Sequence, residues 1–306
     1  MKILVVGYGS IGKRHSTVLN YLGHDIAIVS RRDSDHPKQF KNITEAIKIF
    51  IPDYVVVASR TEEHCSDIKL LADAGFLGKL LIEKPVYRQG SKSPPKVFSS
   101  IKVAFNLRFH PALLRFREIV SERNVYAVNV YVGSYLPNWR PNTDYRKSYS
   151  AIYSQGGGVL RDLSHELDYL TWIFGPWKKV AAIGGHFSNL QINSEDVFLL
   201  LLTTEKVKAI SLNMNYIDTI PRREVIALTN DGTVSLDLIQ NTIKVNDRIE
   251  SFNVSRNTTY EAQHIDMIGG NNQILCDIEE GLANMCLIEA AENAARLGKW
   301  IQALNG

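Results

Sequence analysis

The chain has 306 residues, which is long for one compact core and about right for two domains of ordinary size. Hydrophobic residues make up 45% of it and charged residues 22%, a balance typical of soluble globular proteins. The net charge of +3 is too small to indicate a nucleic-acid partner, and no apolar run approaches the ~20 residues that a membrane-spanning helix needs. We therefore expect a cytoplasmic protein with neither a nucleic-acid nor a membrane partner.

The cysteines and the N-terminus exclude further classes of protein. Cys65, Cys276 and Cys286 show no metal-ligand spacing, and their odd number argues against a disulfide framework. The short N-terminal apolar run is followed at once by glycines, which indicates a strand and not a signal peptide. No metal site is expected.

Short apolar runs alternate with helical patterns through roughly the first hundred residues, which predicts a parallel sheet covered on both faces. The expected strands are 3–6, 26–29, 54–58, 80–82 and 101–105, and the expected helices are 11–22, 44–50 and 62–74. Residues 88–96 (RQGSKSPPK) are rich in Gly, Ser and Pro and are expected to form a loop.

The strongest motif is the loop Gly7-Tyr8-Gly9-Ser10-Ile11-Gly12, which follows a buried strand and opens a helical pattern. In this context Gly7 permits a tight turn, Gly9 lets the backbone approach a pyrophosphate, and Gly12 lets the helix pack close to the strand. Free N–H groups and the positive helix end would hold the diphosphate. Residues 1–108 are therefore predicted to be an NAD(P)-binding Rossmann domain.

The end of the second strand bears on the choice of cofactor. An acidic residue normally stands there for the ribose hydroxyls, but this strand ends in Ser30-Arg31-Arg32. Ser30 and the two arginines can bind a phosphate, which favours NADP(H) and leaves NAD(H) possible. The alternative is a solvated pair of surface arginines. Further candidate cofactor contacts are Ser59, Thr61, His64, Glu83 and Lys84.

Glu83-Lys84-Pro85 directly follows the strand 80–82, so Lys84 is expected at the carboxyl edge of the sheet, where open α/β folds bind ligands. A lysine at this edge can donate to a substrate oxygen and stabilise developing alkoxide charge. A surface lysine before a proline is the commoner case.

From about residue 125 the pattern changes to successive strands joined by short turns. One helix is expected at about 159–174, and a closing helix at 278–297, capped by Asp277 and ended by Gly298. Residues 109–306 are therefore predicted to form an α+β domain with a large open, mainly antiparallel sheet. Its expected strands are 126–132, 180–187, 197–203, 208–214, 224–228, 233–238 and 242–245.

A second group of candidate residues follows the glycines at 156–158, which enter the helix expected at 159–174. Asp162 and His165, three residues apart, are expected to share one face of that helix. A histidine titrates near neutrality, which suits general acid–base work on a hydroxyl or carbonyl group. A lone helical histidine is more often structural.

These motifs, with Asn106-Leu107-Arg108-Phe109-His110-Pro111 between them, resemble in their order the glucose–fructose oxidoreductase/inositol dehydrogenase (Gfo/Idh/MocA) family. The resemblance covers nearly the whole chain and implies redox chemistry on a sugar or polyol. It also implies a catalytic group in which His165 exchanges the substrate hydroxyl proton, Lys84 orients that oxygen and Asp162 supports the polar network.

The sequence departs from the family at two points. Asp162 precedes His165 by three residues, where four is the commoner spacing, so the role of Asp162 is the less certain one. A Pro- and Ser-rich loop also replaces the helix that usually follows Glu83-Lys84-Pro85, so a different coverage of the cofactor is expected there.

The long polar and aromatic segment 134–150 resembles that of a bacterial subgroup of the family associated with surface-sugar biosynthesis. Long loops are often binding loops, and this one carries aromatic residues that stack on sugars and basic residues that hold anions. An acidic or nucleotide-linked sugar is therefore the favoured substrate, although the loop could instead pack against a neighbouring subunit. The candidate substrate-binding residues are Arg108, Trp139, Arg140, Tyr145, Arg146 and Arg161.

Three functions are compatible with these residues. The first is hydride transfer between nicotinamide and a sugar, sugar acid or nucleotide-sugar derivative. The second uses a tightly bound cofactor for transient oxidation, with net epimerisation or elimination. The third is a non-catalytic dinucleotide-binding sensor, against which Lys84 and His165 argue. We also expect a homodimer or homotetramer, because the outer face of the open sheet is partly apolar.

Overall fold

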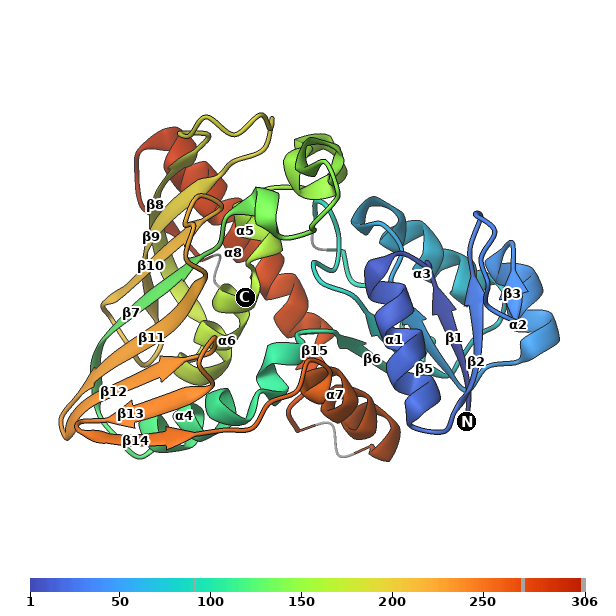
Figure 1. Cartoon of the computed structure of the whole chain (residues 1–306), viewed down its shortest axis with the longest axis horizontal. Coiled ribbons are helices and arrows are strands. Elements are labelled where there is room, and N and C mark those ends of the chain that lie inside the picture. Colours follow the sequence, from blue (N-terminus) through green and yellow to red (C-terminus); the bar gives the residue numbers. More distant parts are fainter. Residues whose placement is uncertain (91, 271–272, 304–306) are drawn as a thin grey trace. The chain divides into compact units, whose positions relative to one another are not determined.

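The computed structural model describes residues 1–90, 92–270 and 273–303, and it contains two compact units (Figure 1). The first unit comprises Met1–Phe109 and Arg256–Met285, and the second comprises His110–Ser255 and Cys286–Gly306. The sequence predicts a single domain boundary after residue 108, with all later residues in the second domain. The structure differs in the segment Arg256–Met285, which returns to the first unit and supplies a helix and an edge strand there.

Over the described residues, the sheet of the first unit has seven strands in the order β15-β6-β5-β4-β1-β2-β3. Strands β1 to β6 are parallel and follow the doubly wound order 3-2-1-4-5-6, while β15 is an antiparallel edge strand beside β6. This confirms the predicted Rossmann fold. The strands are β1 (Lys2–Val6), β2 (Asp25–Val29), β3 (Gln39–Phe40), β4 (Tyr54–Val57), β5 (Lys79–Ile82), β6 (Ser100–Val103) and β15 (Cys276–Asp277).

The helices of the first unit are α1 (Ser10–Tyr21), α2 (Ile43–Phe50), α3 (His64–Asp73) and α7 (Thr258–Gly269), with the short 3-10 helices η1 (Thr61–Glu63) and η2 (Asn106–Phe109). The sequence predicts α1, α2 and α3 to within two residues of their ends. Helix α7 has no counterpart among the predicted elements. Its inward face carries the polar residues Gln263 and His264 beside Met267, so the apolar period of 3.6 residues is broken.

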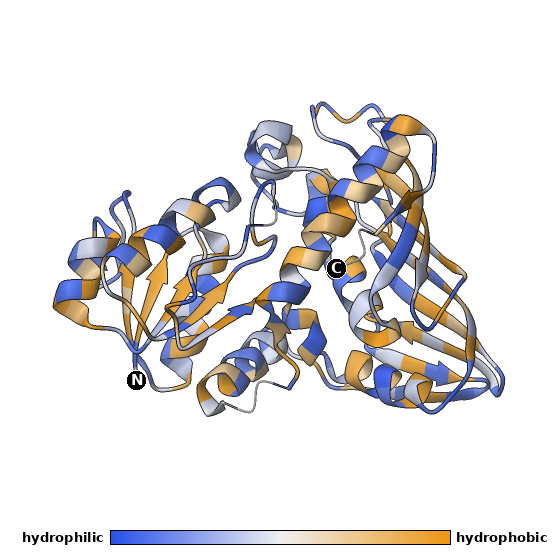
Figure 2. Cartoon of the chain, turned by 180° about the vertical axis from the view of Figure 1, so that it is seen from behind, coloured by the Kyte–Doolittle hydropathy of each residue, from blue (hydrophilic) through white to orange (hydrophobic). Residues whose placement is uncertain are grey.

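The core of the first unit explains why its strands read as continuous apolar runs. Ile3, Leu4 and Val5 of β1 are fully buried because both faces of a parallel sheet are covered. Figure 2 shows these strands as the most hydrophobic part of the unit. The loop after β5 contains no helix over its described residues, as the sequence predicts for 88–96.

The sheet of the second unit has nine strands within the described ranges, in the order β14-β13-β12-β11-β7-β10-β9-β8-β16. Every neighbouring pair is antiparallel except β7 with β10, which is parallel, so the predicted mainly antiparallel sheet is confirmed. The strands are β7 (Val125–Gly133), β8 (Trp177–Gly185), β9 (Val197–Thr204), β10 (Ile210–Asn215), β11 (Arg222–Thr229), β12 (Gly232–Asp237), β13 (Thr242–Val245), β14 (Arg248–Ser251) and β16 (Ile301–Gln302).

Helices cover one face of this sheet and leave the other open (Figure 1). They are α4 (Pro111–Ser121), α5 (Val159–Asp162), α6 (His165–Phe174) and the part of α8 (Ile278–Leu297) that follows Met285. The predicted closing helix agrees with α8 at both ends, and Gly298, with φ +62°, ends it. Short 3-10 helices shape the loop before α5: η3 (Leu136–Asn138), η4 (Tyr145–Lys147), η5 (Tyr149–Ala151) and η6 (Tyr153–Gln155).

The prediction of one continuous helix at 159–174 is wrong. Helix α5 ends at Asp162, where the N–H groups of Asp162 and Leu163 bond to Gly158 and Val159, and Leu163 then leaves the helical region with ψ +25°. The hydrogen-bond ladder resumes in α6, from Asp168 to Ser164. Asp162 therefore closes one helix and His165 opens the next, so a shared helix face cannot be inferred from their spacing.

Within the described parts of the chain, no helix is both long enough and apolar enough to cross a membrane. The same residues contain no group of three or more His, Cys, Asp or Glu side chains that could hold a metal ion.

Candidate active site

The glycine loop joins β1 to α1, and its packing explains two of its glycines. Gly7 has φ +91°, and a Cβ atom there would lie 2.5 Å from the Cα of Ser59. A Cβ on Gly12 would overlap the carbonyl oxygen of Gly7, so α1 can approach its own loop only with glycine at this position. Nothing in the described chain lies within 4 Å of a Cβ built on Gly9. The space beside Gly9 is therefore open for a ligand.

The N-terminus of α1 fits a diphosphate group. Gly9 is the N-cap residue, it supplies no side-chain cap hydrogen bond, and the first turn carries no acidic residue. The first-turn N–H groups and the positive end of this twelve-residue helix lie beside the exposed residues Gly9 and Ser10. Lys13 adds a positive charge 5.3 Å from the centre of the Tyr8 ring. This is the arrangement that binds anions at helix N-termini.

Ser30, Arg31 and Arg32 follow β2 next to this loop, where the Gly7 N–H donates to the carbonyl oxygen of Val29 at 3.0 Å. Ser30 Oγ donates to the backbone oxygen of Arg32 at 2.8 Å. Both arginines are exposed, and the Arg31 guanidinium forms an ion pair with Glu63. Such an exposed pair is weak, so an anionic ligand can compete with Glu63 for Arg31.

Ser59, Thr61 and His64 lie just after β4. Ser59 Oγ donates to Asp67 at 2.5 Å, and Thr61 begins η1. His64 is 1% exposed, and its two ring nitrogens face the carbonyl oxygens of Val86 at 3.0 Å and Ser59 at 3.3 Å. Burial lowers the pKa of His64, and the hydrogen bonds to the two carbonyl oxygens oppose this shift. His64 therefore ties the end of β4 to the loop after β5, and its ring is closed off from solvent.

Glu83 and Lys84 follow β5 at the same carboxyl edge of the sheet. The Glu83 side chain is 13% exposed, and its Oε1 lies 2.8 Å from Nε2 of His15 on α1. Glu83 Oε2 accepts from the Lys84 backbone N–H at 3.2 Å, and Lys84 is partly buried. The glycine loop, Ser59 and the Glu83-Lys84 pair are thus gathered at one edge of one sheet.

In the second unit, Gly158 before α5 leaves room for the carboxylate of Glu195. Gly158 has φ +124°, and a Cβ there would overlap the carboxylate of Glu195. Burial raises the pKa of Glu195 to about 7, and its Oε1 has no hydrogen-bond partner in the structure. Glu195 is absent from the sequence-based candidates, because nothing in Ser194-Glu195-Asp196 distinguishes it from a surface carboxylate.

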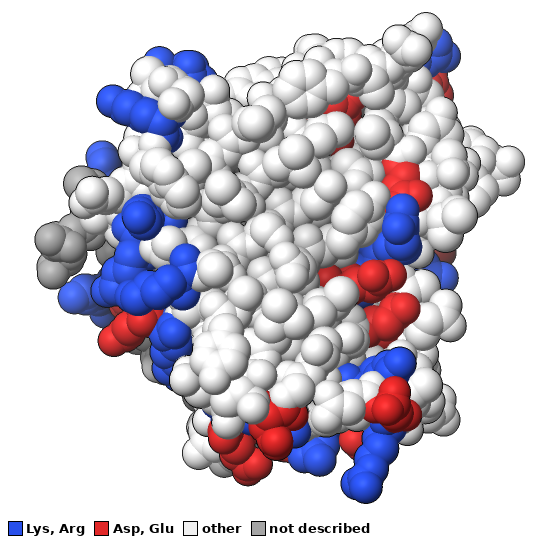
Figure 3. Space-filling view, turned by 90° about the vertical axis from the view of Figure 1, so that its left-hand side faces the viewer, with Lys and Arg blue, Asp and Glu red and all other residues white. Residues whose placement is uncertain are grey.

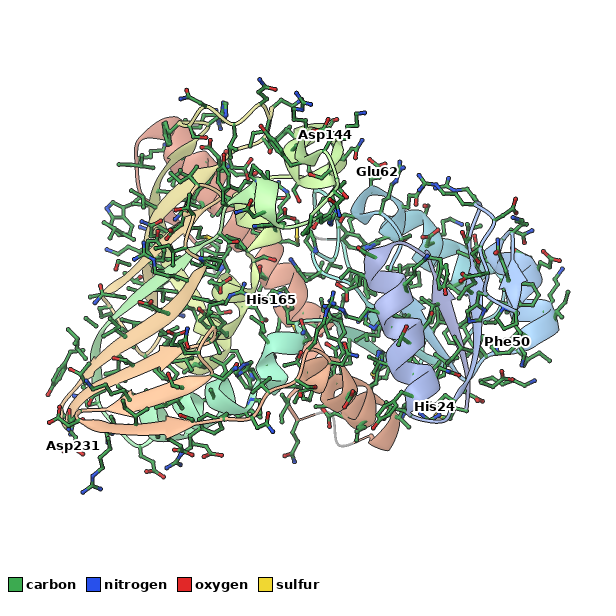
Figure 4. The ribbon with its side chains drawn as sticks, in the orientation of Figure 1. His24, Phe50, Glu62, Asp144, His165 and Asp231 are labelled. Atoms are coloured by element: carbon green, nitrogen blue, oxygen red, sulfur yellow. The ribbon has the colours of Figure 1, made fainter. Side chains whose placement is uncertain are left out.

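Asp162 is the centre of a polar network in the second unit. It is 8% exposed, its Oδ2 accepts from the Tyr216 hydroxyl at 2.6 Å, and Tyr149 also hydrogen-bonds to it. Burial, reinforced by Asp162, raises the pKa of Tyr216 well above its usual value, so this hydroxyl stays a donor. His165 begins α6 three residues later and is partly buried (Figure 4).

Two of the predicted substrate-binding arginines are buried in ion pairs. Arg108, in the first unit, is 2% exposed and donates to Glu280 at 2.8 Å. Arg161, in the second unit, is also 2% exposed and is held by both oxygens of Glu292 on α8. Each guanidinium is thus neutralised by a carboxylate of its own unit.

The loop 134–150 contains a small pocket within the second unit. Trp139 donates to Ser134 Oγ at 2.9 Å and packs edge-on against Tyr216, with ring centres 5.1 Å apart. Arg146 turns instead to Asp144 at 2.8 Å. The pocket brings together three predicted substrate-binding residues and is lined by Leu136, Pro137, Trp139, Arg140, Thr143, Tyr145, Ser148 and Ser150.

The predicted catalytic residues divide between the units. Lys84 lies in the first unit with the glycine loop, whereas Asp162 and His165 lie in the second with the pocket. Each unit therefore carries its own part of the candidate site.

Comparisons with known proteins give one family match and several structural matches. Residues 114–235 match the family model described as GFO/IDH/MocA C-terminal domain. GenD2 from gentamicin A biosynthesis, solved in complex with NAD, is 20% identical with a TM-score of 0.82, over 100% of this chain and 97% of that chain. Levoglucosan dehydrogenase, solved with NADH, is 14% identical with a TM-score of 0.84, over 100% of both chains.

A third similar structure contains a sugar ligand. The WlbA dehydrogenase from Bordetella pertussis, solved with NADH and UDP-GlcNAcA, is 19% identical with a TM-score of 0.79, over 100% of this chain and 98% of that chain. At these identities the structural matches establish the fold. No curated protein sequence matches the chain.

Proposed function

We propose that this chain, which carries the C-terminal domain of the Gfo/Idh/MocA family and has the family's fold, is a nicotinamide-dependent oxidoreductase of sugar derivatives. The observation that carries the proposal is the open, uncapped N-terminus of α1 beside Gly9, at the carboxyl edge of a Rossmann sheet that also presents Lys84. A bound nicotinamide would supply or accept the hydride. Three free cysteines support a reducing compartment such as the cytoplasm.

Within this proposal the chain's own residues bind, orient and move protons. The first-turn N–H groups of α1 hold the diphosphate, and Lys84 donates to the reacting oxygen of the substrate. His165 exchanges the proton of the substrate hydroxyl. Asp162, which accepts a hydrogen bond from the Tyr216 hydroxyl, supports the polar network of the site.

The proposed substrate is an acidic or nucleotide-linked sugar. The partly exposed Trp139 and Tyr145 offer aromatic surface on the loop 134–150, and the exposed Arg140 offers a positive charge there. The WlbA structure with UDP-GlcNAcA supports the same class of ligand. Net epimerisation or elimination through a tightly bound cofactor is the second candidate function. The two differ in whether turnover of sugar acids and nucleotide sugars changes the absorbance of free NADPH.

The preference for NADP(H) is part of the proposal, and it predicts a selective loss. Replacing Arg31 and Arg32 together with alanine should weaken NADPH binding by about 1.5–3 kcal/mol per lost charged hydrogen bond. NADH binding should change little, because NADH lacks the 2′-phosphate. Fluorescence titration of both cofactors against both proteins measures the two losses. Equal losses for NADPH and NADH would mean that the arginines do not bind the 2′-phosphate.

We also propose that the open face of the second sheet is covered by a second copy of the chain. This face exposes Ile183, Leu199, Leu201, Ile226 and Leu228, each at least 36% accessible. Figure 3 shows a wide uncharged surface over these strands, with lysines, arginines and carboxylates at its margins. An apolar patch with a charged rim is typical of an interface between subunits.

Light scattering at micromolar concentration should therefore give a multiple of the 34.4 kDa monomer mass. The double variant Leu199→Glu, Leu201→Glu should give a monomer, because it places two charges in the centre of the proposed interface. Ile49→Glu is the matched control, since Ile49 is 65% exposed but lies in the first unit. A wild-type protein that elutes and scatters as a monomer contradicts the proposal.

A further inference from the structure

A continuous chain of hydrogen-bonding side chains crosses the interior of the first unit. We call it the buried relay, and it consists of Glu83, His15, His264 and Tyr54. Oε1 of Glu83 lies 2.8 Å from His15 Nε2, and His15 Nδ1 lies 2.8 Å from His264 Nε2. His264 Nδ1 lies 2.9 Å from the Tyr54 hydroxyl. The two histidines and the tyrosine are completely buried, so only Glu83, at 13%, reaches the surface.

The four residues come from elements far apart in the sequence. His15 lies on α1, Tyr54 on β4 and His264 on α7, and Glu83 follows β5. Helix α7 belongs to the segment Arg256–Met285, which returns to the first unit between the two parts of the second unit. The relay thus joins the helix that follows the glycine loop to the residue that precedes Lys84.

With both histidine rings neutral, the Glu83 end of the relay sets the direction of its hydrogen bonds. The Glu83 carboxylate accepts, so His15 carries a proton on Nε2, and in a neutral His15 ring Nδ1 is then an acceptor. His264 must then donate from Nε2, which leaves its Nδ1 to accept from the Tyr54 hydroxyl. Burial holds the pKa of His264 well below its usual value, which agrees with a neutral ring. Tyr54 therefore donates to His264, His264 to His15 and His15 to Glu83, so all three hydrogen bonds run toward Glu83.

Burying these polar groups has a cost that apolar residues of similar size would avoid. The relay is satisfied along its whole length, and its one accessible end is the carboxylate that accepts from the Lys84 N–H. We propose that the buried relay is a positioning device, in which His15 and His264 hold the Glu83 carboxylate and thereby the backbone of Lys84. The positioning role rests on the proposed function of Lys84, whereas the direction of the hydrogen bonds does not.

The direction is tested on the full chain by side-chain nitrogen NMR of protein labelled with ¹⁵N-histidine. His15 and His264 should each show a protonated Nε2 and an unprotonated Nδ1, with signals assigned by the variants His15→Gln and His264→Gln. Tyr54→Phe should shift Nδ1 of His264, because it removes the donor to that atom. Tyr169→Phe is the matched control, since Tyr169 is buried like Tyr54 but lies in the second unit. A proton on Nδ1 of either histidine overturns the assignment.

The positioning role is tested by rescue at His15. His15→Leu should lower kcat about tenfold, the rate equivalent of one lost hydrogen bond to a charged group, while the NADPH dissociation constant stays within about twofold. His15→Gln should restore most of the rate, because its amide can donate to Glu83 and accept from His264. Equal rates for the leucine and glutamine variants overturn the role. If wild-type protein binds no nicotinamide cofactor, the proposed function fails, and the NMR result still decides the direction of the relay.

Discussion

Replacing His165 with alanine should lower kcat by about 10²–10⁴-fold, the usual cost of losing a general acid–base group. The NADPH dissociation constant should stay within about twofold, because the proposed role of His165 is proton exchange with the substrate hydroxyl and not binding of the diphosphate. Screening sugar acids and nucleotide sugars first identifies a working substrate. Steady-state kinetics and cofactor titration then separate the effect on chemistry from the effect on binding.

His186→Ala is the matched control for this experiment. His186 lies in the same unit and is exposed, and its Nε2 donates to the Leu190 carbonyl oxygen at 2.8 Å and lies 3.4 Å from Oδ2 of Asp196. It should turn over substrate at nearly the wild-type rate. If His165→Ala does the same, His165 is a structural histidine and the catalytic assignment fails.

Lys84→Ala should lower kcat by a similar factor if it orients the oxygen whose proton His165 exchanges. Two groups that serve one proton transfer are not additive, so the double variant should be far less impaired than the product of the single losses. A fully multiplicative double variant would mean that the two residues act in separate steps. Asp162→Ala should cost less in rate, because Asp162 acts through the network with Tyr216 and Tyr149.

The sequence predicts the parts of this molecule whose cause is local. The apolar runs of β1, β2, β4, β5 and β6 follow from burial on two faces, and the alternating strands β7 to β13 follow from burial on one. The glycine loop is recognisable because a left-handed turn at Gly7 and the tight packing at Gly12 each require glycine. Lys84 is found because the end of a parallel strand lies at the ligand-binding edge of its sheet.

The parts that the sequence does not predict depend on contacts between distant segments. The buried faces of α7 and α1 carry His264 and His15, and no local pattern shows that these two side chains meet each other. The sequence favours Arg161 as a substrate ligand because it follows the glycines at 156–158. In the structure its guanidinium pairs with Glu292, which is 131 residues later in the chain. The break between α5 and α6 is equally hidden, because Leu163 and Ser164 are compatible with a helix.

Alanine substitutions in the glycine loop should separate binding from folding. Gly12→Ala would gain up to about 1 kcal/mol of helix propensity, but its Cβ would overlap the backbone oxygen of Gly7. Overpacking against backbone typically costs about 1–3 kcal/mol, so this variant should lose free energy of unfolding and bind NADPH more weakly. Gly269→Ala is the control for propensity alone, since its Cβ meets no atom of the described residues within 4 Å.

Gly9→Ala should weaken NADPH binding and leave the free energy of unfolding nearly unchanged. Its Cβ meets no atom of the described chain within 4 Å, so the free energy of unfolding should fall by less than about 1 kcal/mol, the N-cap preference for glycine over alanine. The same methyl group would stand where the backbone approaches the diphosphate, so NADPH affinity should fall by tenfold or more, or about 1.4 kcal/mol. Chemical denaturation and cofactor titration measure the two quantities on each variant. A Gly9→Ala protein that binds NADPH as tightly as the wild type would show that the diphosphate does not bind at the N-terminus of α1, and the proposed function would lose the observation that carries it.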